Sequence, residues 1–220
     1  MAKAALKFYG KILVLALLVS AAAKCNYQAG CSASDLRCDP LLSSVLFMRN
    51  TCATQGYCKM FATAGTWFGD LGGAPGVSGA DSRCNADANK PTGGGTYSAL
   101  ISDGSTRIAS VTANVGDGQV GWVMLPNMEY RNASGATVWT TNSSGLFVFG
   151  TLTNQITSGG TYFTGMDTLW VSNATCLAWT DGTGANQGRY GVGGTTTSTA
   201  LALTQTACNV AQRGLYCVQR

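Results

Sequence analysis

The sequence of 220 residues contains no histidine. This absence excludes Ser-His-Asp and Cys-His catalytic groups, histidine general bases and histidine-containing zinc sites. Zinc held by cysteine alone would use closely spaced pairs such as Cys-x-x-Cys, and the nine cysteines form no such pair. We therefore expect neither a metal nor another cofactor.

Charge is also scarce, since Asp, Glu, Lys and Arg make up 11% of the chain. The formal net charge of +4 arises near the N-terminus, because four of the fourteen basic residues (Lys3, Lys7, Lys11 and Lys24) precede residue 25. The remaining ten basic residues balance ten acidic ones. A surface for nucleic acid or anionic lipid needs a basic excess, so neither is expected as a partner.

The N-terminal apolar stretch is short. Residues 12–23 are twelve apolar or small residues, too few to cross a bilayer as a helix. A basic start, a short apolar stretch and a small-residue end together describe a secretory signal peptide, which we assign to residues 1–24. Two cleavage positions stay open, one after Ala23 and one directly before Cys25.

Cys25 is the first of an odd number of cysteines. If Cys25 carries a lipid, eight cysteines remain, an even number for disulfides. We therefore expect lipidation at Cys25 and an exported protein anchored in the bacterial cell envelope, at the outer membrane or the cell surface. Lys24 stands where bacterial lipoproteins usually carry a small residue. The alternative is a soluble secreted protein in which Cys25 is free or paired with another chain.

Residues 25–57 are predicted to form an N-terminal cap or stalk. Asp39 can cap a short helix that has Pro40 at its first position. Two disulfides are expected within this region and at its border, but their pairing cannot be read from the sequence. The four cysteines concerned are Cys31, Cys38, Cys52 and Cys58.

Residues 58–220 are predicted to form one α+β domain, with helix early and an irregular antiparallel sheet later. Ser78 is expected to cap a helix that runs toward Pro91, with Asp81 in its first turn, where a negative charge suits the helix dipole. Residues 191–206 are expected to form a long mobile loop that leads into a strand. Strands are predicted at 59–64, 96–102, 107–111, 120–125, 137–140, 146–149, 169–171, 177–179 and 216–218.

Acidic residues are the remaining candidates for catalysis. Asp70, Asp81, Asp167 and Asp181 could in principle pair as acid and base, as in glycosidases. Turn and helix-start positions explain them better, because Asp70 and Asp181 lie beside glycine. Glu129 is predicted to be a surface ion-pair partner in a loop. We therefore expect a protein that is not an enzyme, with a carboxylate hydrolase as a less favoured interpretation.

The five tryptophans could form a stacking platform for a ligand. Trp122, Trp170 and Trp179 lie in strand-like runs and are expected in the core. Trp67 and Trp139 flank loops and are the better candidates for exposure.

Several stretches after Cys58 carry a family resemblance. They are MFATAGTWFGDLGG, GADSRCNADA, TYSALISD, GWVMLPNMEY, TYFTGMDTLW, CLAW and the closing LYCVQ. On these stretches the domain resembles a family of exported leptospiral proteins that carry an uncharacterised domain related to endostatin and the C-type-lectin-like fold. The resemblance implies a C-type-lectin-like (endostatin-like) fold with long loops. It also implies two nested disulfides, Cys84–Cys217 and Cys176–Cys208.

The same resemblance implies a non-enzymatic binding module. The resemblance implies host extracellular-matrix or plasma proteins as partners, since some leptospiral endostatin-like proteins bind laminin, fibronectin, plasminogen or factor H. We expect the contact on loops 127–145 or 181–206. A structural envelope lipoprotein without a ligand is the alternative. A carbohydrate-binding lectin is less favoured, because Leu125-Pro126-Asn127 lacks the first carboxylate or amide of a calcium–sugar loop.

Overall fold

The computed structural model describes residues 52–72, 76–150 and 152–220, which belong to the compact unit Asn50–Arg220. Cys25, Cys31, Cys38 and the predicted helix after Asp39 lie outside the described residues. The predictions of a signal peptide, a lipid anchor and an N-terminal cap or stalk therefore stay predictions.

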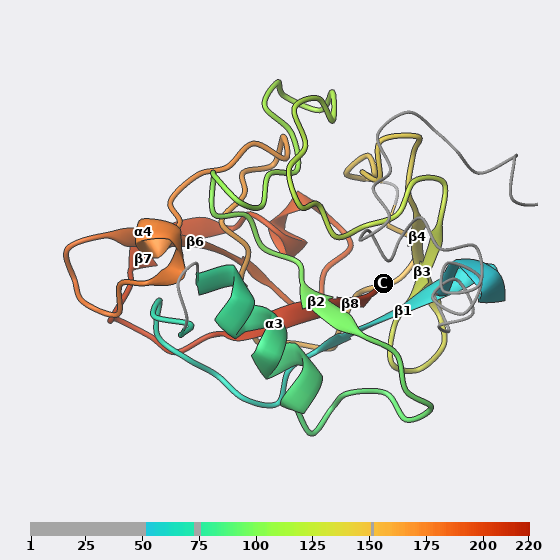
Figure 1. Cartoon of the computed structure of the whole chain (residues 1–220), viewed down its shortest axis with the longest axis horizontal. Coiled ribbons are helices and arrows are strands. Elements are labelled where there is room, and N and C mark those ends of the chain that lie inside the picture. The colour runs from blue at the N-terminus through green and yellow to red at the C-terminus, as the bar shows by residue number, and fades with distance from the viewer. Residues whose placement is uncertain (1–51, 73–75, 151) are drawn as a thin grey trace, which may run out of the picture. The chain divides into compact units, whose positions relative to one another are not determined.

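Eight strands form one mixed sheet in the order β4-β3-β1-β8-β5-β6-β7, with β2 also paired to β8. Because β1 and β2 both pair with the same stretch of β8, they lie on its opposite edges, and β8 is the centre of the sheet (Figure 1). The strands are β1 (Tyr57–Ala62), β2 (Tyr97–Ala99), β3 (Glu129–Arg131), β4 (Thr137–Thr140), β5 (Thr161–Phe163), β6 (Gln187–Val192), β7 (Thr204–Ala207) and β8 (Gly214–Gln219).

The expectation of an α+β, C-type-lectin-like fold with an antiparallel sheet is wrong. The regular structure of the described residues is mostly sheet, and β1 pairs with β3, and β5 with β8, in parallel. Within the described residues, helix is confined to α3 (Gly76–Ala86), the short turn α4 (Cys176–Trp179) and two single turns, η2 (Cys52–Gln55) and η3 (Ser198–Ala200). Strand pairing joins residues far apart in the chain, so its direction could not be read from local patterns.

The two central strands are buried on both faces. Side chains alternate along a strand, so Met60 of β1 and Tyr216 of β8 enter one apolar cluster. Phe61 and Cys217 enter a second cluster, beneath α3. A strand covered on both faces is apolar almost continuously, which explains the composition of β8.

Helix α3 lies against β2 and β8 (Figure 1) and satisfies the outer edge of β2 with its side chains. Asn85 binds Tyr97 twice, accepting from its N–H at 3.0 Å and donating to its carbonyl at 2.6 Å. Two residues further along β2, Asp81 Oδ1 accepts the N–H of Ala99 at 2.8 Å, and Arg107 donates to the Ala99 carbonyl at 3.0 Å. These side chains replace the strand that this edge lacks.

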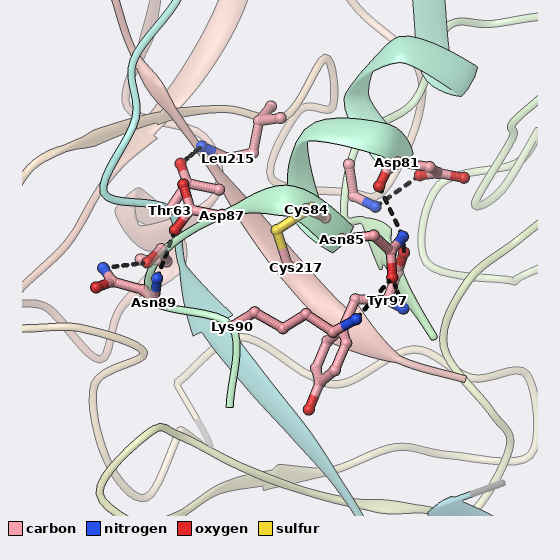
Figure 2. Close-up of a disulfide and its surroundings, with 12 residues drawn as sticks. Thr63, Asp81, Cys84, Asn85, Asp87, Asn89, Lys90, Tyr97, Leu215 and Cys217 are labelled. Atoms are coloured by element: carbon pink, nitrogen blue, oxygen red, sulfur yellow. Dashed lines mark hydrogen bonds between the residues drawn. A yellow bond between two sulfur atoms is a disulfide. The ribbon is translucent and has the colours of Figure 1, made fainter. Parts of the chain in front are cut away.

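Three disulfides hold the described residues. Cys84 of α3 bonds to Cys217 of β8 across the helix–sheet interface (Figure 2), and Cys176 bonds to Cys208. These are the two nested pairs that the resemblance implies. The third bond, Cys52–Cys58, fixes part of the pairing that the sequence left open.

The predicted strand at 177–179 is wrong, because these residues belong to α4. All residues of α4 have φ between 47° and 65°, so the turn is left-handed although it contains no glycine. A left-handed turn costs roughly 1–2 kcal/mol per residue of this kind. Burial of Trp179, whose Nε1 donates to the Ser102 carbonyl at 2.8 Å, and the Cys176–Cys208 bond hold it in place.

Replacing Leu177 with glycine is expected to stabilise the protein by about 0.5–1 kcal/mol, because relief of the left-handed strain exceeds the added entropy of the unfolded chain. Leu177 is 65% exposed, so little packing is lost. Thermal unfolding of Leu177→Gly measures the change. Leu203→Gly is the control: this leucine is 45% exposed and has no positive φ, so its replacement should lower the melting temperature. Equal decreases in melting temperature for both variants would contradict the proposed backbone strain at Leu177.

The other strand and loop predictions are confirmed only in part. The strand at 137–140 is confirmed as β4, and those at 59–64 and 216–218 appear as β1 and β8 with shifted ends. The predicted strands 107–111 and 120–125 meet only at the single bridge Ile108–Val120. The segment 191–206, expected as a loop, holds the end of β6, all of η3 and the start of β7.

Candidate functional site

Three of the acidic candidates stabilise the turns in which they lie. Asp70, Asp167 and Asp181 each accept a hydrogen bond from the backbone N–H two residues later, at 2.9, 2.8 and 2.6 Å. Such bonds stabilise turns in which the aspartate side chain substitutes for backbone. The turn interpretation of Asp70 and Asp181 is therefore confirmed.

Asp81 has a different role from the one predicted. The helix begins at Gly76, and no acidic residue lies in its first turn. Asp81 instead forms a two-pronged ion pair with Arg107, with Nη1–Oδ1 at 2.9 Å and Nη2–Oδ2 at 2.7 Å. The Arg107 side chain is only 7% exposed. Asp81 thus joins α3 to the loop after β2.

Every carboxylate of the described residues accepts hydrogen bonds from the protein. Asp103 and Asp117 each gather several N–H and hydroxyl donors of their own loops, and Asp87 holds the chain that follows β1. The carboxylates concerned are those of Asp70, Asp81, Asp87, Asp103, Asp117, Glu129, Asp167 and Asp181. Carboxylates thus hold the loops of this part of the chain in shape.

The tryptophan predictions hold in part. Trp170 and Trp179 are buried as expected, and Trp122 is partly buried against the cluster that contains Trp170. Trp139 is 1% exposed and stacks on Phe147 with ring centroids 4.1 Å apart, so its predicted exposure is wrong. Both Val138 and Trp139 of β4 are buried in the same apolar cluster, although the loop-flanking position of Trp139 suggested exposure.

The β3–β4 turn, residues 132–135, is the most promising surface feature. Asn132 accepts hydrogen bonds from Ser134 and Ala136 through its side-chain oxygen. Its side-chain nitrogen donates to the Gln155 carbonyl at 3.0 Å. Gly135 has φ of 86°, which an L side chain rarely adopts. The turn is therefore fixed in shape before any ligand arrives.

Two hollows lie on either side of this turn and share residues 132–134. The first, which we call the amide hollow, has a volume of about 410 Å³. Its polar lining comes from Asn89, Asn132, Ser134, Gln155, Thr157 and Ser158. The second, the cationic hollow, has a volume of about 340 Å³. Its lining includes Tyr57, Lys59, Pro91, Thr92, Arg131 and Ser134.

Arg131 is held in one orientation at the cationic hollow. Its guanidinium lies over the ring of Tyr57, 4.0 Å from the centroid. Its Nε donates to Glu129 Oε1 at 2.6 Å, and Thr137 donates to the same oxygen at 2.8 Å. The hydrogen bonds from Arg131 and Thr137 lower the pKa of Glu129, so this carboxylate is ionised at neutral pH. The ion-pair prediction for Glu129 is confirmed, although Glu129 lies in β3 and not in a loop.

Lys59 joins this group through parallel pairing. Lys59 of β1 and Arg131 of β3 are register partners, so both side chains lie on the same face of the sheet. No local pattern indicates this pair, because its members lie 72 positions apart in the sequence. Only the predicted loop 127–145 includes the shared turn, and no residue of 181–206 lines either hollow.

Two further observations concern the described residues alone. None of their helices is both long enough and apolar enough to cross a lipid bilayer. Their cysteine and acidic side chains form no group of three or more that could hold a metal ion.

No curated protein matches the chain. A family model described as "Protein of unknown function (DUF1554)" matches residues 64–196, a segment that begins just after β1 and includes α3, the β3–β4 turn and β6. Because this segment exceeds half of the sequence, the chain belongs to that family.

Proposed function

We propose that this protein is an exported, lipid-anchored module of the bacterial surface that binds a ligand without catalysis. Cys25 is the proposed lipid attachment point. The contact surface is the β3–β4 turn with its two hollows. Components of the host extracellular matrix or plasma are the proposed partners, as the family resemblance implies.

The shape of the turn carries this proposal. Side-chain hydrogen bonds fix residues 132–136 from both sides, and both hollows open on the same three residues. A surface that is already ordered loses less entropy when a ligand binds. Disulfides between α3, β8 and the later loops keep the supporting sheet rigid, as suits an oxidising compartment.

The use of the carboxylates supports binding over hydrolysis. Each described carboxylate accepts hydrogen bonds that shape a loop or join two elements, as shown above for Asp81 and Asp103. A general acid or base needs a side chain free to exchange a proton with a substrate. In the structure, these carboxylates stabilise loops or join two elements.

Replacing Ala133 with tryptophan is expected to weaken binding to immobilised laminin or fibronectin at least tenfold, because the bulky indole would extend from a residue that lines both hollows. Ala133 is exposed, so folding should be preserved. Surface plasmon resonance with the mature, disulfide-bonded protein measures the affinity.

The matched control is Ser143→Trp. Ser143 is the exposed second residue of a similar turn, Asn142-Ser-Ser-Gly145, in which Asn142 also accepts from the residue two positions later. This variant should bind as the unchanged protein does. If Ala133→Trp binds with unchanged affinity, the contact surface is elsewhere. If the unchanged protein binds neither coating, laminin and fibronectin are rejected as partners; if it binds none of the matrix probes, a structural role without a ligand replaces the proposal.

A further inference from the structure

We propose that the cationic hollow binds the sulfate or carboxylate groups of an acidic polysaccharide, with the neighbouring sugar seated in the amide hollow. This inference rests on the proposed function and names the ligand class of the same site. Four features carry it: the fixed guanidinium, the second cation, the two hollows that share residues 132–134, and the capped sheet edge.

The guanidinium of Arg131 is oriented for an anion. Its Nε is occupied by Glu129 and its face by Tyr57, which together fix its plane. Among the described residues, neither terminal nitrogen of Arg131 donates to a protein acceptor, and the side chain is 37% exposed. A planar pair of free N–H donors matches the geometry of a carboxylate or sulfate.

Lys59 adds a second positive charge beside Arg131. Within the part of the chain that the structure describes, its ammonium has no acidic partner within ion-pair distance. Lys90, one residue before the Pro91 wall of the hollow, instead contacts Asn85 and the Tyr97 ring. Lys59 and Arg131 against Glu129 leave the hollow with a net positive charge, which attracts an anionic ligand.

The two neighbouring hollows suit an extended, hydroxylated ligand. The amide hollow shares its lining residues 132–134 with the cationic hollow and presents amides and hydroxyls. These groups donate and accept hydrogen bonds as sugar hydroxyls do. A protein partner would need buried aromatic or aliphatic anchors at its centre, and polar side chains supply most of this lining.

The sheet edge next to the site is not open to an added peptide strand. On the outer side of β4, the Val138 carbonyl accepts the N–H of Thr153 at 2.9 Å. The Thr137 carbonyl accepts Asn154 Nδ2 at 2.9 Å. Because residues 153–154 occupy these acceptors, strand addition is blocked, which favours a ligand bound through side chains.

Arg131→Gln and Lys59→Gln are each expected to weaken binding to immobilised heparin at least tenfold, because each removes one cation from the hollow. Arg131→Lys should give an intermediate loss, since it keeps the charge and loses the fork. The mature, disulfide-bonded protein is used, and binding should weaken as salt rises. Retained heparin affinity in both Gln variants would overturn the site assignment.

Arg189→Gln is the matched control. Arg189 is a strand arginine that contacts Asn173 and lines neither hollow, so its loss should leave heparin binding unchanged. An equal loss of heparin affinity in Arg189→Gln would show that binding depends on net charge alone, and would reject the hollow as the site. Thermal unfolding of each variant separates lost binding from lost folding.

The probes distinguish this inference from the proposed function. Binding to hyaluronan, which carries carboxylates alone, would assign the carboxylate; binding to heparin alone would assign sulfate. Binding to neither, with laminin or fibronectin binding still sensitive to Ala133→Trp, would overturn the polysaccharide and leave the binding module standing with a protein ligand. Loss of that sensitivity as well would overturn both.

Discussion

Replacing Cys84 and Cys217 together with alanine is expected to lower the free energy of unfolding by about 5 kcal/mol, the largest effect of any change considered. The two cysteines are 133 residues apart, so their bond removes a large loop-closure entropy from the unfolded chain. Both side chains are fully buried between α3 and β8 (Figure 2), so alanine also loses packing. Urea denaturation without reductant measures the change.

The Cys52–Cys58 pair provides the control. It is also fully buried, but its partners are only six residues apart. The same chain-entropy relation gives a loss of about 2 kcal/mol when both become alanine. If removal of the short-range bond costs as much as removal of the long-range one, the entropic account of these disulfides is wrong.

Asp81→Ala is expected to destabilise the protein by about 3 kcal/mol, because it leaves the nearly buried Arg107 guanidinium without its counter-charge. The N–H of Ala99 loses its acceptor at the same time. The Asp81 side chain is 27% exposed, so the effect lies at the lower end for a buried pair. The midpoint of urea unfolding, at an unchanged slope, measures it.

Glu129→Ala tests the same chemistry at the surface. The Glu129–Arg131 side chains are 29% and 37% exposed, and removal of such a pair should cost at most about 1 kcal/mol. Asp81→Leu combined with Arg107→Met should recover stability relative to Asp81→Ala, because no unpaired charge is left buried. Equal losses for Asp81→Ala and Glu129→Ala would contradict the burial argument.

Local patterns predicted the elements whose cause is local. The run that became β4 and the apolar run that became β8 were recognisable, and α3 lies where a helix was expected. The left-handed α4 was not recognisable, because neither Cys176 nor Trp179 is of a type, such as glycine, that indicates a positive φ. Its cause is tertiary: a buried indole and a distant cysteine hold it.

The site shows the same division. The turn at 132–135 could be expected from its Asn, Ser and Gly residues. The cationic hollow could not, because Lys59 reaches Arg131 only through a parallel pairing that no local pattern encodes. Asp81 was likewise assigned to the helix dipole, since its partner Arg107 lies 26 positions away.

The central place of β8 has a consequence for biogenesis. A polypeptide that emerges N-terminus first, from a ribosome or an export channel, delivers residues 214–219 after every other strand. Until then β1, β2 and β5 lack the neighbour that joins them. The sheet can therefore be completed only after residue 219 has been synthesised or translocated. Until then, the earlier segments can still pass through a channel as an extended chain. Nascent chains halted before that point should be digested by protease, and those released beyond it should resist.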